Sequence, residues 1–200
     1  KAVQYYIPST MRESVSFDDA VTYNLVAGKI EKTKLKSDGE FDEKINKYWS
    51  RKKIAMPNVK EGSIIEYEYT IKSPNIVAMK DWSFQTSIPV NYSEFKTYIP
   101  EYFVYKPNHK GFVFPKTSVE KSQKSQTYSY REKNQPGEGV ISHTSQEKLD
   151  YEETQTTYIC QNLPSMKDEA FVNNIDNYTS SISHELTMTR YPNQPYKTFA

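Results

Sequence analysis

The stretch Ser63-Ile64-Ile65-Glu66-Tyr67-Glu68-Tyr69-Thr70-Ile71-Lys72-Ser73 carries the clearest structural signal in this chain. Its apolar side chains alternate with polar ones at the two-residue period of a strand that has one wet face, the apolar set being Ile65, Tyr67, Tyr69 and Ile71. The preceding residues 57–62 are rich in turn formers and end on Gly62, where we expect a positive φ. Pro74 follows and ends the pairing, because proline has no N–H for a ladder. The stretch therefore predicts a sheet strand bounded by two turns.

Similar runs lie on both sides of this strand and are separated by Pro, Gly and Asn. They predict strands at 21–26, 29–35, 81–88, 90–99, 102–106, 126–131, 154–161 and 177–190. The step Ala27-Gly28 is typical of a tight hairpin, and Trp82 and Phe84 alternate with polar residues as core side chains do. This pattern favours an all-β fold, a large antiparallel β-sandwich that is immunoglobulin-like or larger.

Three segments depart from the strand pattern. Residues 41–48 place Phe41, Ile45 and Tyr48 at helical spacing, which predicts one short helix. Residues 163–171 are expected to form an ordered loop or a single helical turn, and the polar segment 116–153 carries a mobile hairpin tip at 135–139. We find no linker inside the chain and predict one domain over residues 1–200. After Arg190, prolines and an asparagine are expected to prevent regular pairing, so residues 191–200 would begin a linker to a downstream domain.

Composition narrows the classes of function. The 200 residues include 17 Tyr and 9 Phe, which argues for a folded chain because disordered chains are poor in aromatic residues. With 26 Lys and Arg against 25 Asp and Glu, the net charge of +1 provides no field to hold nucleic acid. No apolar run is long enough to span a membrane, so we expect no membrane insertion. Any export signal would have to lie upstream of Lys1.

The residues that could carry chemistry are few and scattered. Cys160 is the single cysteine, which excludes an internal disulfide and a multi-cysteine zinc site. No strained turn surrounds it, and its possible bases, His109, His143 and His184, stand in no metal-binding or catalytic motif. Adjacent carboxylates point to opposite faces of a strand and make poor acid/base pairs. We therefore predict no catalytic residue, no metal site and no cofactor.

Aromatic side chains remain as candidates for binding. Alternating aromatics are usually core residues, but rings near prolines and near the C-terminus are the ones to expect partly exposed. The candidate interaction surface comprises Tyr98, Tyr102, Tyr105, Tyr191, Tyr196 and Phe199. Such rings could pack against a neighbouring domain of the same polypeptide, or could bind a peptide or a glycan.

Several segments resemble motifs of a bacterial family of unknown function. Residues 56–70 (MPNVKEGSIIEYEYT) are similar to its PNVKxGSxIEYxYxI motif, and DWSFQ with IPV (81–85, 88–90) to DWxFQxxIPV. Residues 99–103 resemble the IPEYF motif of this family, and residues 163–169 resemble its xPAxKxE motif. Residues 175–178, which follow, also match the family. This family stands N-terminal to transglutaminase-like cores, mostly in exported multidomain proteins of Bacteroidetes. In relatives an additional strand precedes the part that matches residues 1–9.

The resemblance implies a β-sandwich, a periplasmic or extracellular location, and a catalytic core that follows this region. Cys160 matches no family motif and inherits no catalytic role. The expected function is a non-catalytic accessory domain that docks on, or presents substrate to, a downstream transglutaminase-like or peptidase-like core. The alternative is an independent β-sandwich module that binds glycan or peptide. An open aromatic platform with a polar border would favour this alternative, whereas a hydrophobic patch near Ala200 would favour docking.

Overall fold

The computed structural model describes residues 1–77, 79–131, 144–167, 174–191 and 194–199. Over these residues the chain is all-β, with several antiparallel sheets, no α-helix, and 3-10 turns at Ser9–Met11, Ser37–Gly39 and Ile175–Asn177. The all-β fold class predicted from the sequence is thus confirmed. The chain divides into two compact units, Lys1–Ile76 (unit 1) and Val77–Ala200 (unit 2). The single domain over 1–200 stays a prediction.

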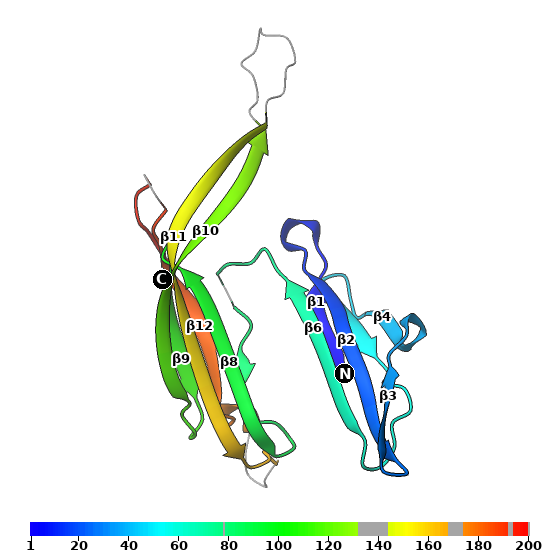
Figure 1. The fold of residues 1–200 in the computed structure, drawn as a ribbon. Coiled ribbons are helices and arrows are strands. Elements are labelled where there is room, and N and C mark those ends of the chain that lie inside the picture. Colours follow the sequence, from blue (N-terminus) through cyan, green and yellow to red (C-terminus); the bar gives the residue numbers. More distant parts are fainter. Residues whose placement is uncertain (78, 132–143, 168–173, 192–193, 200) are drawn as a thin grey trace. The chain divides into compact units, whose positions relative to one another are not determined.

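Unit 1 consists of two three-stranded antiparallel sheets (Figure 1). The first has the order β1-β5-β4, formed by Ala2–Tyr6, Trp49–Ile54 and Glu40–Lys44. The second has the order β3-β2-β6, formed by Lys29–Lys34, Ser14–Val26 and Ile64–Lys72. Both sheets contribute to the apolar interior, where Val3, Ala20, Val21 and Ile54 are buried.

The stretch that predicted the fold is β6, which pairs along its length with β2. Tyr67 and Tyr69 stack with their centroids 6.4 Å apart, and the Lys1 ammonium lies 5.9 Å from each ring centroid. Ile65 and Tyr67 nevertheless remain 43% and 39% exposed. The strand is confirmed, but its apolar face is only partly covered within unit 1.

The turns of unit 1 agree with the sequence. Ala27 and Gly28 have φ of 49° and 77° between β2 and β3, as a two-residue hairpin with two left-handed residues requires. Gly62 has φ of 81°, as predicted. Its turn is closed by Ser63, whose N–H donates to the Lys60 carbonyl at 3.0 Å and whose hydroxyl donates to Asn24 Oδ1 at 2.6 Å.

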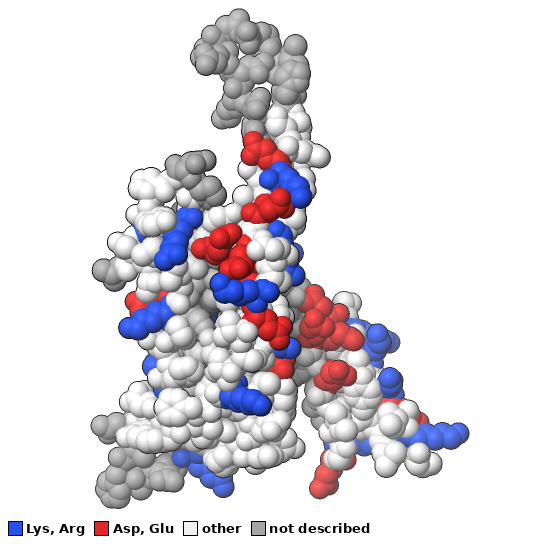
Figure 2. Space-filling model, turned by 60° about the vertical axis from the view of Figure 1, so that its left-hand side comes forward, with Lys and Arg blue, Asp and Glu red and all other residues white. Residues whose placement is uncertain are grey.

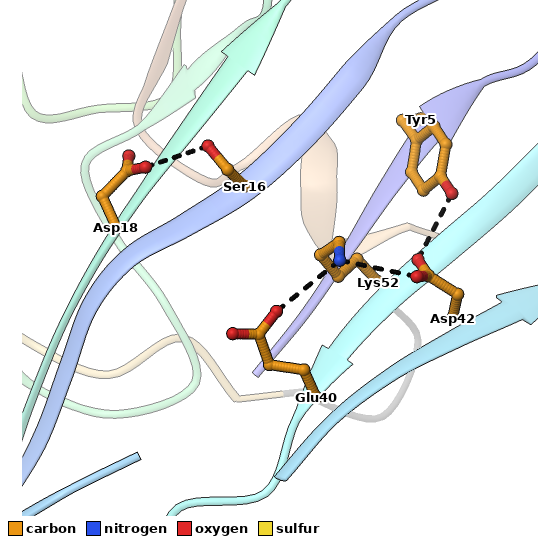
Figure 3. A network of polar contacts seen from close by, with 6 residues as sticks. All are labelled: Tyr5, Ser16, Asp18, Glu40, Asp42 and Lys52. Atoms are coloured by element: carbon orange, nitrogen blue, oxygen red, sulfur yellow. Dashed lines mark hydrogen bonds and ion pairs between the residues drawn. The ribbon is translucent and has the colours of Figure 1, made fainter. Parts of the chain in front are cut away.

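The short helix predicted at 41–48 is wrong, because these residues form β4 and the turn into β5. The Asn46 side chain accepts hydrogen bonds from the N–H groups of Tyr48 and Trp49 and so closes that turn. Across the strands, Lys52 lies 3.6 Å from Glu40 and 3.5 Å from Asp42 (Figure 3). Ladder pairing and alternating charges therefore outweigh three apolar residues at helical spacing, too few to form a stable helix.

Unit 2 pairs two further antiparallel sheets (Figure 1). One has the order β10-β11-β8, formed by Lys116–Arg131, Thr144–Leu163 and Val90–Pro100. In the other, β12 (Ser181–Thr189) pairs with β9 (Phe103–Lys110), β7 (Trp82–Ser83) and β13 (Lys197–Thr198). Residues of both sheets and of the segment after β7 form the core, namely Phe84, Val90, Phe95, Tyr158, Cys160, Leu163 and Ile182.

The predicted strand 81–88 is reduced to Trp82–Ser83. Phe84 is 1% exposed and confirmed as a core residue, whereas Trp82 is 36% exposed. The Trp82 ring lies flat on Phe95 with centroids 5.5 Å apart, and its N–H donates to Ser93. Trp82 therefore covers the edge of the core and is not enclosed by it, which corrects its predicted core position.

At the C-terminal end of the chain, Lys197 and Thr198 pair with Thr189 and Met188 of β12. The expectation that the prolines would prevent regular pairing after Arg190 is therefore wrong at these two residues. The predicted hairpin tip at 135–139 lies outside the described residues. So do residues 168–171, the second part of the loop predicted at 163–171.

Candidate functional site

Three of the segments that carry the family resemblance meet at one pocket of unit 2. This motif pocket has a volume of about 750 Å³ and is lined by Gln85, Phe112, Val113, Pro164, Ser165, Met166, Lys167, Ile175 and Tyr178. Its walls come from the segments after β7 and β11, the turn between β9 and β10, and the 3-10 turn before β12. Among the lining residues that the structure describes, Lys167 alone carries a formal charge.

Gln85 ties the walls of the motif pocket together. Its side chain is 5% exposed, accepts a hydrogen bond from the Ser180 N–H at 3.1 Å and donates one to the Pro164 carbonyl at 3.4 Å. Backbone hydrogen bonds join the same segments: the Phe84 N–H donates to the Ser180 carbonyl and the Met166 N–H to the Thr86 carbonyl, both at 2.8 Å. Because these partners are far apart in sequence, the pocket depends on the tertiary fold.

Gly111 allows the fourth wall to approach. It has φ of 80°, and a Cβ placed on it would lie 2.6 Å from both Cα and N of Ser180. The Ser180 hydroxyl in turn accepts a hydrogen bond from Val113 N–H at 2.9 Å. This contact holds Phe112 at the rim, where it is 79% exposed and stacks on Tyr178 with centroids 6.1 Å apart. The rim is therefore apolar and open.

The predicted interaction residues are brought together only in part. Tyr102, Tyr191 and Tyr196 line a second pocket, the C-terminal pocket, of about 670 Å³. The rings of Tyr102 and Tyr191 stack at 6.4 Å, and the Arg190 guanidinium lies 5.6 Å from the centroid of Tyr196. The remaining lining residues are polar: Glu101, Lys121, Glu152, Thr154, Arg190 and Gln194.

The other three predicted residues do not line the C-terminal pocket. Tyr105 is half-buried beside Phe103, with centroids 6.4 Å apart, and burial raises the pKa of its hydroxyl. Tyr98 is 54% exposed on β8. Phe199 is half-buried, with the Lys197 ammonium 5.1 Å from its ring centroid. An aromatic interaction surface over all six residues stays a prediction.

Cys160 and the histidines form no catalytic arrangement in the described part of the chain. Cys160 is 4% exposed among the apolar core residues, and burial raises the pKa of its thiol. None of the hydrogen bonds found between described residues joins it to a histidine. His143 lies outside the described ranges. No group of His, Cys, Asp and Glu in those ranges has the geometry to hold a metal ion.

Charged side chains are mixed over the surface. Figure 2 shows acidic and basic groups interspersed along the β10–β11 hairpin, where Lys121–Glu152 (2.6 Å) and Lys148–Asp150 (3.1 Å) are ion pairs. Such alternation gives no broad field of one sign. In the described ranges, no helix is long and apolar enough to cross a membrane.

The residues that shape the motif pocket were missed by sequence reasoning. Gly111, Phe112 and Val113 stand in the turn after β9, and Ser180 precedes β12. A signal was present, because Phe112-Val113-Phe114 is an apolar run between Gly111 and Pro115, where a solvent-exposed turn would be polar. No feature of the sequence pointed to Ser180.

These features define an all-β domain whose described residues form open pockets and no catalytic set. The chain matches the DUF3857 family, a domain of unknown function with a solved structure, over residues 3–138, and it belongs to that family. A similar solved structure is that of a putative protease from Parabacteroides distasonis, with 12% identity and a TM-score of 0.60. The match covers 96% of this chain and 32% of the Parabacteroides chain. A comparison with curated proteins found no match.

Proposed function

We propose that this chain is a non-catalytic accessory domain that docks on, or presents substrate to, a transglutaminase-like or peptidase-like core of the same polypeptide. The observation that carries the proposal is the extent of the structural match. Nearly the whole chain corresponds to only 32% of the Parabacteroides chain, so that protein has room for further domains beside the shared fold. A location outside the cytoplasm, periplasmic or extracellular, belongs to the proposal through the family resemblance, and cell fractionation tests it.

The motif pocket is the docking surface in this proposal. Its exposed Phe112 and Tyr178 offer apolar area, and Lys167 is the one charged residue among its described lining residues, which is the composition of an interface centre. The hydrogen bonds of Gln85 and Ser180 fix its walls, so little conformational entropy is lost on binding. The occupant would be a segment of the neighbouring domain with apolar side chains.

The test compares hydrogen exchange of residues 111–114 in the 200-residue chain and in the longer polypeptide that carries it. Docking should slow this exchange in the longer polypeptide, and Phe112→Ser should abolish the difference. Tyr98→Ser is the matched control, because Tyr98 is also exposed but lines neither pocket. Equal exchange in the two polypeptides would refute docking at the motif pocket.

The C-terminal pocket favours a second candidate function, an independent module that binds glycan or peptide. Its tyrosine rings stand beside Arg190, Lys121 and two carboxylates, an aromatic platform with a polar border. Sugars stack their apolar faces on such rings. Titration with neutral oligosaccharides and with short peptides tests this candidate, and Tyr191→Ala should weaken any binding that occurs here. No binding in either series would eliminate it.

A further inference from the structure

A third hollow lies inside unit 2, between its two sheets. This inter-sheet cleft has a volume of about 450 Å³, and its lining comes from β8, β10 and β11 of one sheet and β9 and β12 of the other. The volume falls in the range of small-molecule sites. The wall from the first sheet presents threonines, Thr97 and Thr156 among them, while the opposite wall presents the rings of Phe103 and Tyr105.

The cleft contains one buried polar group, in Thr97, for which no partner is found among the described residues. Thr97 is 5% exposed, and its hydroxyl has no hydrogen-bond partner among the described residues. The hydroxyl oxygen is buried in the present rotamer, so a ligand in the cleft would reach it after rotation about χ1. His184 is also 5% exposed, and its Nε2 lies 3.3 Å from the Tyr158 hydroxyl. Buried polar groups are rarely left unpaired in folded proteins, so the Thr97 hydroxyl is a place where a water molecule or a ligand would complete the hydrogen bonding.

The electrostatics of the cleft disfavour an anionic partner. Among its described lining residues there is no Lys or Arg. Burial lowers the pKa of His184, an effect that His109 adds to, so the imidazole stays neutral near pH 7. Burial also keeps Tyr158 protonated by raising the pKa of its hydroxyl. The carboxylate in the lining, Glu101, accepts a hydrogen bond from Glu152 N–H at 2.9 Å. An anion would lose its hydration here and gain no cation in return.

We propose that the inter-sheet cleft binds a small uncharged molecule, a ring with one amide or hydroxyl group that pairs with Thr97. The rings of His109 and Tyr158 in the lining already meet edge to face, with centroids 6.1 Å apart. A ring-shaped ligand would make further contacts of this kind with them. This site is independent of docking at the motif pocket and of binding at the C-terminal pocket.

The test uses four probes of similar size: benzamide, benzoate, benzylammonium and toluene. Ligand-observed NMR gives their affinities, and the shifts of the His184 and Tyr158 ring signals locate the site. Benzamide should bind at least roughly tenfold more tightly than benzoate, because the anion is desolvated without gaining a cation. A tenfold ratio of dissociation constants corresponds to about 1.4 kcal/mol. Equal affinity for benzamide and benzoate, or no shift at His184 and Tyr158, would overturn the proposal.

Two variants separate the roles of shape and hydrogen bonding. Thr97→Val keeps the shape and removes the hydroxyl, so it should weaken benzamide several-fold and leave toluene unchanged. Val119→Trp should close the cleft to all probes, because Val119 lies at the rim on β10 and is 59% exposed. Its control, Ser118→Trp, points to the opposite face of the same strand and should leave binding intact. Binding that survives Val119→Trp would show that the probes sit elsewhere.

Discussion

Gly62 and Gly111 have nearly the same φ, 81° and 80°, but different surroundings. An alanine at Gly62 would meet no atom within 4 Å, so Gly62→Ala should cost only the left-handed strain, about 1 kcal/mol. At Gly111 the new Cβ would lie 2.6 Å from the Ser180 backbone, which cannot yield without loss of its bonds to Phe84 and Gln85. Overpacking of this kind adds roughly 1–3 kcal/mol, so Gly111→Ala should cost roughly 2–4 kcal/mol.

Urea unfolding followed by tryptophan fluorescence measures both costs, because Trp49 lies in unit 1 and Trp82 in unit 2. Each glycine variant is also made in the Trp49→Phe background, where Trp82 reports on unit 2, and in the Trp82→Phe background, where Trp49 reports on unit 1. We expect Gly62→Ala to shift the Trp49 signal and Gly111→Ala the Trp82 signal, the latter by more. Equal losses of unfolding free energy in the two variants would refute the close approach of Gly111 to Ser180.

Three further predictions concern the interior of unit 2. Phe84→Ala should lower the free energy of unfolding by about 3–5 kcal/mol, and Trp82→Ala by clearly less because Trp82 is 36% exposed; equal losses would contradict this. His184 has its pKa lowered from 6.5, mainly by burial, with His109 adding to the effect and Asp81 opposing it. The unfolded chain then binds more protons, so stability should fall as pH drops through 6.5. The urea midpoint should therefore decrease between pH 7.5 and 5.5, and His184→Gln should make this decrease smaller. Cys160 should react slowly with iodoacetamide in the native protein and rapidly in urea, because burial raises the pKa of its thiol; rapid native labelling would show an open, reactive site.

Most period-two segments were predictable because alternation is a local property of the sequence, although 81–88 forms a strand only at Trp82–Ser83. The segments at 64–72 and 90–100 form long strands, and the Ala27-Gly28 turn has the two positive φ values that its residues favour. The segment 41–48 was mispredicted because its structure depends on neighbours. Glu40 and Asp42 share Lys52 across a sheet, and such a cross-strand pair leaves no periodic trace.

The candidate sites were less accessible to sequence reasoning, because each is assembled from distant segments. Tyr102 and Tyr191 meet because Arg190 N–H donates to the Tyr102 carbonyl at 2.8 Å, at the end of the β9–β12 pairing. The motif pocket closes through Gln85 and Ser180, of which only Gln85 lies in a segment that resembles a family motif. Motifs indicated the segments, whereas hydrogen bonds across the fold determine which of them share a pocket.

Stability and docking can be separated at the motif pocket because its rim and its frame use different residues. Gly111 and Gln85 belong to the frame, where substitution disturbs buried backbone contacts. Phe112 is 79% exposed, so Phe112→Ser should leave the urea midpoint of unit 2 nearly unchanged. A docking defect in Phe112→Ser with unaltered stability would therefore report on the surface itself. The same defect in Gly111→Ala would report only on a frame that no longer holds the surface in place.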